Sequence, residues 1–365
     1  MNLINKKKHS RSRSFRMSFL FGALLCAFLT TTMTGKAFSQ TPRGVFCLLP
    51  VGAGAGQDPS VYYNVDVDGI SVRQNWSDLE PSEDVYDWTY LDKVTARAAV
   101  AGKPVLLRIS TQANKPAWVT TAVADAGGTF FTFGGKNGQT TIPVFWDPTY
   151  LAKKTAMIAA LGAHFTNNPA VKIVGASFAN SQSEDWAVPH TPADVTAWFA
   201  GGYTSAKMLA AGKQIIDATM AAFPNQYVTL SVGTNGHLAS GPNLDPTANY
   251  VAHNAVLDAR ASWPGRLIVQ KNTLAAFTPA APATGTVWAF LFNSGPDIGG
   301  QMLYWCFGDT TYKVNGGVPA DPAIVLRNAV DIGLGYQMSY IEIYRTDVLN
   351  LPVVVAYAHD ALTAP

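Results

Sequence analysis

Two glutamates stand out as residues that could carry out acid–base or nucleophilic chemistry. Glu184 follows a polar stretch that contains Asn180 and Gln182, whereas Glu342 lies inside the apolar run 340–344. Cleavage of a glycosidic bond usually needs two carboxyl groups, one to protonate the leaving oxygen and one to act as nucleophile or base. We therefore predict that Glu184 is a general acid/base and that Glu342 is the second catalytic carboxylate.

Each glutamate also has a structural interpretation. Glu184 could be a solvated loop residue beside Asp185. Glu342 could form an ion pair with Arg108 or Lys271, because an unpaired charge in an apolar strand is costly. These alternatives stay open at the level of the sequence.

Residues suited to sugar binding accompany these carboxylates. Aromatic rings can stack on sugar faces, and amide and guanidinium groups can bond to hydroxyls. We expect a carbohydrate partner. The predicted substrate-binding residues are Trp76, Arg108, Asn180, Gln182, Trp186, His190, Gln270, Asn272, Tyr304 and Trp305.

The elements that must position these residues are short apolar runs that alternate with helical stretches. The predicted strands are residues 44–49, 69–74, 104–109, 173–178, 227–232, 266–270, 301–306 and 340–344. Several are apolar at successive positions, which is typical of parallel strands covered on both faces. Helices are predicted at 90–101, 150–165, 204–223 and 321–332, and long loops at 126–141 and 278–286.

This alternation of strands and helices predicts βαβ units and an α/β fold. Eight parallel strands fit a single-domain (β/α)₈ barrel (TIM barrel), and a doubly wound open sheet is the alternative. In such a barrel the active-site residues lie at the C-terminal ends of the strands. The candidate residues fall in or just after the predicted strands, where a barrel would need them.

The N-terminal segment has the composition of a secretory signal. Six basic residues within 1–16 precede an apolar run from Met17 to about Leu29 and the small-residue site Ala37-Phe38-Ser39. The apolar run is shorter than the roughly 20 residues that span a bilayer, and a retained anchor is the alternative. We predict a signal peptide at 1–39 and a mature domain at 40–365 that is secreted or periplasmic and has no membrane attachment.

Composition argues against several partners and cofactors. Charged residues make up 14% of the chain and the net charge is +2, so we expect no concentrated basic surface for nucleic acid. No cysteine–histidine spacing suggests zinc, no spaced acidic loop suggests calcium, and no organic cofactor is expected. Cys47 and Cys306 could form a disulfide or remain buried thiols. The oligomeric state is left open.

The segment 72–81, with the sequence VRQNWSDLEP, is followed by Tyr86-Asp87-Trp88 and Leu91-Asp92. This order of elements resembles the second-strand region of β-galactosidase-like clan A glycoside hydrolases. Within that pattern Glu80 is expected to be structural. Further pieces resemble bacterial barrel proteins of the same neighbourhood, namely residues 115–119, 143–148, 180–184, 202–204, 269–272 and 340–344.

The resemblance implies a barrel and a proton-donating glutamate after the fourth strand. Two features differ from the family pattern. Clan A enzymes usually carry adjacent Asn and Glu residues there, whereas Asn180 and Glu184 are four positions apart. Their nucleophile normally lies on the seventh strand, whereas Glu342 is on the predicted eighth. Asp309, after the predicted seventh strand, is therefore the alternative second carboxylate, and retention or inversion stays open.

We predict a glycoside hydrolase that cleaves a β-linked glycoside or oligosaccharide. The first alternative is a carbohydrate-binding barrel that uses the same aromatic residues without a competent pair of carboxylates. The second is a structural or surface-assembly protein whose barrel mouth is occluded.

Overall fold

The computed structural model describes residues 40–52, 59–135, 138–177, 192–233, 250–284 and 287–364. The chain divides into two units, Met1–Ala37 and Phe38–Pro365. The predicted signal peptide lies outside the described residues, so its assignment stays a prediction. The elements below belong to the second unit.

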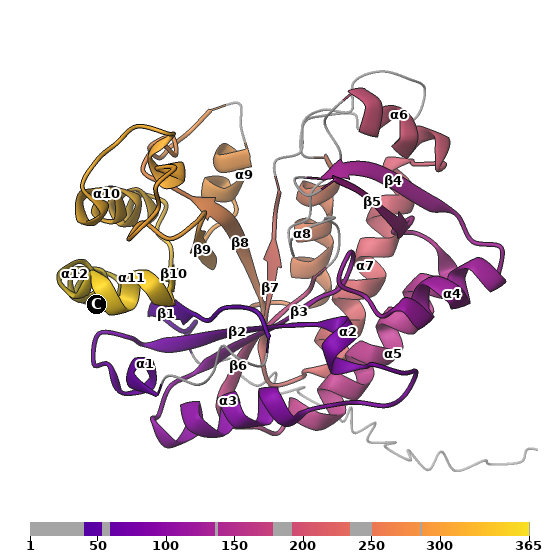
Figure 1. The fold of residues 1–365 in the computed structure, drawn as a ribbon, viewed down its shortest axis with the longest axis horizontal. Coiled ribbons are helices and arrows are strands. Elements are labelled where there is room, and N and C mark those ends of the chain that lie inside the picture. The colour runs from indigo at the N-terminus through magenta and orange to yellow at the C-terminus, as the bar shows by residue number, and fades with distance from the viewer. Residues whose placement is uncertain are drawn as a thin grey trace, which may run out of the picture. The chain divides into compact units, whose positions relative to one another are not determined.

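Eight parallel strands close into a barrel, which confirms the predicted (β/α)₈ fold over the open sheet (Figure 1). Around the barrel their order is β1-β10-β9-β8-β7-β6-β3-β2. Closure rests on β1, where Phe46 is in register with Gly69 on one side and with Glu342 on the other. The strands are β1 (Gly44–Leu48), β2 (Gly69–Asn75), β3 (Val105–Ser110), β6 (Val171–Gly175), β7 (Tyr227–Ser231), β8 (Leu267–Leu274), β9 (Ile298–Met302) and β10 (Tyr340–Tyr344).

Helices surround the barrel, and several begin at the start signals that their sequences carry. Asp147 and Asp321 accept hydrogen bonds from the first turns of α5 and α10, and each is followed by proline. The Thr204 side chain likewise accepts a hydrogen bond from Lys207 N in the first turn of α7. The helices are α1 (Ser60–Tyr63), α2 (Trp76–Leu79), α3 (Thr89–Val100), α4 (Ala117–Asp125), α5 (Pro148–Phe165), α6 (Pro192–Ala200), α7 (Ser205–Ala222), α8 (Tyr250–Ser262), α9 (Val287–Asn293), α10 (Pro322–Gly335), α11 (Arg345–Asn350) and α12 (Pro352–Thr363), with a 3₁₀ turn at Lys313–Asn315.

Successive side chains of each strand point alternately out of and into the barrel, and they therefore contribute to two separate apolar cores. Outward side chains such as Val45 and Ile341 pack against the helices in the main core. Inward side chains near the N-terminal ends form a separate apolar cluster inside the barrel, consisting of Phe46, Leu106, Ile173, Tyr227, Ile268 and Tyr340. Gly69 and Gly299 make room for this cluster, because a Cβ atom at either position would lie about 2.5 Å from the ring of Phe46 or Tyr340.

Two predicted segments differ from the structure. The seventh barrel strand is β9, Ile298–Met302, rather than 301–306, so Tyr304 and Trp305 follow the strand instead of lying in it. The predicted loop 126–141 contains an antiparallel hairpin, β4 (Phe130–Gly135) and β5 (Gly138–Pro143). Its Phe131 ring packs against Trp198 of α6, with ring centroids 4.6 Å apart.

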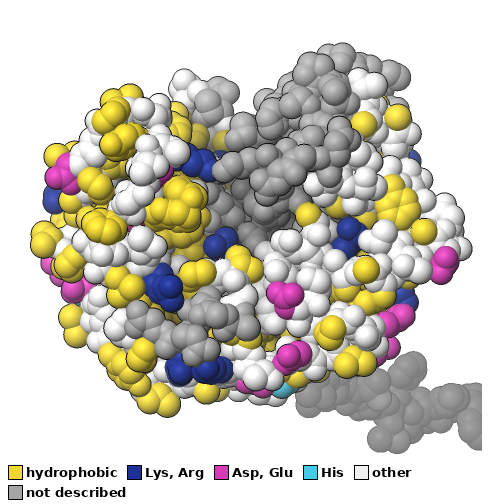
Figure 2. Space-filling model, in the orientation of Figure 1, with side chains coloured by type: hydrophobic (Ala, Val, Ile, Leu, Met, Phe, Trp, Pro, Cys, Tyr) yellow, Lys and Arg dark blue, Asp and Glu magenta, His cyan; other side chains and the backbone are white. Residues whose placement is uncertain are grey.

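Exposed apolar side chains gather on the side formed by α10, α11 and α12, seen at the left of Figures 1 and 2. They include Ile324, Leu349 and Val353. Within the described residues no helix is long and apolar enough to cross a membrane. Cys47 and Cys306 are both buried and form no disulfide, which decides between the two alternatives that the sequence left open.

Candidate functional site

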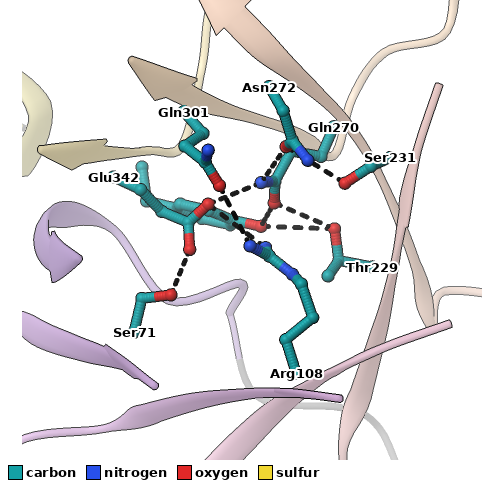
Figure 3. A network of polar contacts seen from close by, with 9 residues as sticks. Ser71, Arg108, Thr229, Ser231, Gln270, Asn272, Gln301 and Glu342 are labelled. Carbon is teal, nitrogen blue, oxygen red and sulfur yellow. Dashed lines mark hydrogen bonds and ion pairs between the residues drawn. The ribbon is translucent and has the colours of Figure 1, made fainter. Parts of the chain in front are cut away.

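A layer of polar side chains lies inside the barrel, one step above the apolar cluster. Because inward positions recur every second residue, Arg108, Thr229, Gln270 and Glu342 follow Leu106, Tyr227, Ile268 and Tyr340 on their strands. Figure 3 shows these side chains converging from opposite walls of the barrel. We call this set the polar floor, and it comprises Ser71, Arg108, Thr229, Gln270, Gln301 and Glu342 together with Tyr340.

Glu342 is at the centre of the polar floor. Its Oε2 atom lies 3.1 Å from Arg108 Nη2 and accepts a hydrogen bond of 2.6 Å from Gln270 Nε2. Its Oε1 atom accepts a hydrogen bond from the Ser71 hydroxyl. The side chain is 0% exposed. Of the two ion pairs considered as the structural alternative, the one with Arg108 is present, whereas Lys271 Nζ lies 6.0 Å from the Trp288 ring of α9.

This environment bears directly on the predicted catalytic role of Glu342. A nucleophile must form a bond to the sugar, but both oxygens of the buried Glu342 carboxylate already accept from protein side chains. Reaching a substrate would cost one of these contacts and separate a buried charge from its partner. Its role as the second catalytic carboxylate stays a prediction that this geometry does not favour.

Arg108 reaches across the barrel because the neighbouring strand β6 leaves room for its stem. Its Nη1 atom donates to Gln301 Oε1 at 3.1 Å, in addition to the ion pair with Glu342. On the neighbouring strand β6, a Cβ atom at Gly175 would lie 2.7 Å from Arg108 Cγ. The glycine therefore permits the arginine stem to lie flat along the barrel wall.

The polar floor continues toward the C-terminal mouth through Asn272. Gln270 Nε2 donates to Asn272 Oδ1 at 2.7 Å, and the Ser231 hydroxyl donates to the same oxygen at 3.1 Å. Asn272 is 6% exposed. The sequence prediction placed Arg108, Gln270 and Asn272 at one site, and the structure brings these three together.

Aromatic side chains lie together at the C-terminal end of the barrel, at the end of β10 and just after β9. Tyr304 and Trp305 stack with ring centroids 3.5 Å apart, and the Tyr344 ring lies 6.2 and 5.8 Å from them. All three are partly exposed. We call Tyr304, Trp305 and Tyr344 the aromatic wall.

A buried carboxylate holds the loop that carries Tyr304 and Trp305 of the aromatic wall. Asp347, in the first turn of α11, is 0% exposed and accepts from the backbone nitrogens of Cys306 and Phe307 at 2.8–2.9 Å. The Cys306 thiol bonds to it as well. Burial raises the pKa of Asp347 to about 6, and these hydrogen bonds oppose that shift.

Trp76 lies elsewhere than predicted. It begins α2, has no exposed surface, and its Nε1 atom donates to Glu80 Oε2 at 2.7 Å. Trp118 and Tyr150 pack against it. We correct its assignment from substrate binding to the core, because a fully covered ring offers no face to a sugar. Glu80, which also accepts from Asp84 N, has the structural role expected of it.

Several predicted residues fall outside the described part of the chain. Glu184 and its companions Asn180, Gln182, Trp186 and His190 all lie within 178–191, so their placement stays a prediction. Asp309 is described. Its carboxylate accepts from Thr311 and from the backbone of Lys313, and these bonds lower its pKa although partial burial alone would raise it.

Sequence reasoning missed Ser71, Thr229 and Gln301 of the polar floor, and Ser231, which donates to Asn272 beside it. The available signal was a polar residue at every second position, on the inward face, in the C-terminal half of an otherwise apolar run. It was obscured because the outward positions of these strands are apolar as well. Among the described residues, no group of three or more His, Cys, Asp and Glu side chains could hold a metal ion.

Comparisons with known proteins agree with this fold. Residues 57–180, about a third of the chain, match a family model described as β-galactosidase, Glyco_hydro_42. The match contains the segment that carried the resemblance in the sequence, which confirms that resemblance. No curated protein sequence matches the chain significantly.

Among solved structures, the β-galactosidase from the psychrophilic Marinomonas ef1 is similar, with a TM-score of 0.52 and 12% identity over 83% of this chain and 54% of that chain. A β-galactosidase from Rahnella sp. R3 has a TM-score of 0.49 and 12% identity over 84% and 51%. Xylanase 10B from Thermotoga maritima has a TM-score of 0.49 and 12% identity over 83% of both chains. The chain thus spans about half the length of the two β-galactosidases, and at this identity the first similarity shows the barrel fold alone.

Proposed function

We propose that this protein is a glycosidase that cleaves a β-linked glycoside or oligosaccharide at the C-terminal mouth of the barrel. The observation that carries the proposal is the pairing of the polar floor with the aromatic wall. Amides and hydroxyls suit sugar hydroxyls, and stacked rings suit the apolar faces of pyranose rings. The match of residues 57–180 to a β-galactosidase family supports the same activity.

In this proposal Glu184 is the general acid/base. It follows β6, the fourth barrel strand, and active-site groups in such barrels come from the segments that follow the strands. A neighbouring apolar or aromatic surface would raise the pKa of such a carboxyl group, as a proton donor at neutral pH requires.

Glu342 serves a different purpose in this proposal. Its carboxylate holds Arg108 and Gln270 in place beneath the sugar, rather than attacking the sugar itself. The two roles can be separated by substitution, because a glutamine at 342 retains an oxygen that accepts from both partners but is too weak a nucleophile to replace a carboxylate.

The test is hydrolysis of a panel of β-glycosides by the wild type and by Glu184→Gln, Glu342→Gln and Glu83→Gln. Glu83 is half exposed and pairs with Lys153 on the surface, so its variant is the matched control. For Glu184→Gln we expect roughly 10²–10⁴-fold lower kcat on alkyl glycosides and a smaller loss on 4-nitrophenyl glycosides, whose leaving group needs little protonation. Wild-type rates for Glu184→Gln on both substrate types would remove Glu184 from the mechanism.

The Glu342→Gln variant separates the two roles of that residue. A positioning role predicts that kcat falls by less than about tenfold, whereas loss of a nucleophile costs several orders of magnitude. The second outcome, in a variant whose urea denaturation matches that of the wild type, would restore Glu342 as the second catalytic carboxylate.

One observation favours a second function, a carbohydrate-binding barrel without catalysis. The only carboxylate of the polar floor is saturated by protein donors, among the residues that the structure describes. Sugar-dependent changes in tryptophan fluorescence, together with no hydrolysis across the panel, would support this second function.

We also propose that residues 1–39 are a signal peptide and that the mature protein is exported. N-terminal sequencing of the protein released by an expressing bacterium should begin near Gln40. A start at Met1 on a membrane-bound product would instead indicate a retained anchor.

A further inference from the structure

The polar floor fixes the orientation of the Gln270 amide. Its Nε2 atom donates to Glu342 at 2.6 Å and to Asn272 at 2.7 Å. Its Oε1 atom accepts from Tyr340 at 2.5 Å and from Thr229 at 3.1 Å. An ionised carboxylate can only accept hydrogen bonds, so the end of Gln270 that faces Glu342 must be the nitrogen.

The orientation of Gln270 determines that of Asn272. Gln270 Nε2 donates toward Asn272, so the atom it meets must be the oxygen, and the Ser231 hydroxyl donates to that oxygen too. The nitrogen is therefore the end of Asn272 that remains for another acceptor. Among the described residues, Asn272 Nδ2 is buried and has no hydrogen-bond partner.

A buried donor without a partner is rare in folded proteins and calls for an explanation. Asn272 lies two residues beyond Gln270 toward the C-terminal end of β8, the end at which barrel enzymes bind substrates. Its side chain is more than nine-tenths buried, so its amide is held rather than free to rotate.

We propose that Asn272 Nδ2 donates a hydrogen bond to the bound glycoside. The acceptor is an oxygen of the sugar, either a hydroxyl or the ring oxygen. Glu342 is a positioning residue for this contact, because its Oε2 atom accepts from Gln270 Nε2 and so sets the Gln270 amide and thereby the Asn272 amide. This inference rests on the proposed sugar site, but it does not require that the bound sugar be cleaved.

The experiment is a double-mutant cycle with Asn272→Ala, Gln270→Met and the double variant. The probes are 4-nitrophenyl β-D-galactopyranoside and 4-nitrophenyl β-D-xylopyranoside for KM and kcat, and the methyl β-glycosides of both sugars for Kd by tryptophan fluorescence. Loss of one hydrogen bond predicts a roughly 3- to 10-fold rise in KM or Kd for Asn272→Ala. Gln270→Met should show a similar rise, and the double variant should show no more than the larger single effect.

Deoxy analogues of the sugar that binds identify the acceptor. Removing the hydroxyl that Asn272 binds should weaken binding to the wild type and leave binding to Asn272→Ala unchanged. Asn350→Ala, an exposed position on α11, is the control for substitution of an asparagine and should bind like the wild type. If Asn272→Ala does not fold, Asn272→Asp removes the donor with almost no change in size.

The outcomes separate this inference from the proposed function. A wild type that binds a glycoside but cleaves none overturns the glycosidase proposal. The double-mutant cycle is then evaluated from the Kd values of the wild type and the three variants. A wild type that cleaves, with KM unchanged in Asn272→Ala, overturns the role of Asn272. Additive losses in the double variant would show that Gln270 acts independently, which overturns the positioning role of Glu342. Absence of binding to every probe overturns the sugar-binding role of Asn272.

Discussion

Arg108 on β3 and Glu342 on β10 come from strands that are separated by β2 and β1 in the barrel, and their charged atoms are 3.1 Å apart with side chains only 1% and 0% exposed. Charges this deeply buried are stable only as a pair, because each alone would lose its hydration without compensation. The pair therefore links β3 and β10, which are not hydrogen-bonded to each other in the barrel.

Breaking this pair should be strongly destabilising. We expect Glu342→Leu to lower the free energy of unfolding by about 3–5 kcal/mol, because it leaves Arg108 buried and uncompensated. The double variant Arg108→Leu/Glu342→Leu should recover much of that loss. Urea denaturation of both variants checks this, and a double variant no more stable than the single one would contradict it.

Gly175 should tolerate no side chain. A Cβ atom there would lie 2.7 Å from Arg108 Cγ, close to the backbone end of the arginine, so the stem must shift. We expect Gly175→Ala to cost about 1–3 kcal/mol, as overpacking of a core usually does. Gly335→Ala is the matched control, since its Cβ would meet only Ala281 at 3.9 Å, and it should unfold like the wild type. Thermal unfolding of the two variants tests the difference.

Glu80 should matter for stability and not for sugar binding. Glu80→Ala removes the acceptor of the buried Trp76 indole N–H, and an unsatisfied buried donor costs about 1–3 kcal/mol. We expect a lower unfolding free energy with an unchanged Kd for the methyl glycosides. A change in Kd without a change in stability would place this region in the binding site instead.

Asp347 should make stability depend on pH. Its pKa in the folded protein is about 6, raised by burial above the ordinary value of 3.8. Between these values the folded state holds a proton that the unfolded state has released, so folding is favoured as the pH falls. The Cys306 thiol beside it stays protonated, because burial raises its pKa as well.

Comparison of the wild type with Asp347→Asn isolates this contribution. The wild-type advantage in unfolding free energy should grow as the pH falls from 7 to 4, measured by urea denaturation at several pH values. Asp360→Asn, an exposed position on α12, is the control and should not reproduce the trend. A difference between the wild type and Asp347→Asn that is constant with pH would show that Asp347 does not titrate in this range.

The local pattern of apolar and β-branched residues was enough to predict the barrel and most of its strands. The runs at 69–74, 227–232 and 340–344 are apolar and β-rich along the chain itself, and β2, β7 and β10 form there. The starts of α5 and α10 were equally visible, since Asp147-Pro148 and Asp321-Pro322 satisfy the first backbone N–H groups from within a few residues.

β9 could not be located from its own residues. Its glycines are poor strand formers. They are needed at these positions because residues far away in the chain leave no room for a side chain. A Cβ at Gly299 would meet the Tyr340 ring at 2.5 Å, and one at Gly300 would meet Met338 Sδ at 2.3 Å. The apolar residues that follow therefore looked like the strand, although they form the loop with the aromatic wall.

The fold class and the polar character of the site follow from residue patterns along the chain. The roles of the charged residues depend on how the folded barrel pairs them. Glu342 was compatible with catalysis or with an ion pair, and the outcome depended on Arg108, which is 234 positions away in the chain. Strand periodicity is a local property, whereas burial and pairing of a charge depend on which distant side chains the closed barrel brings within 3 to 4 Å.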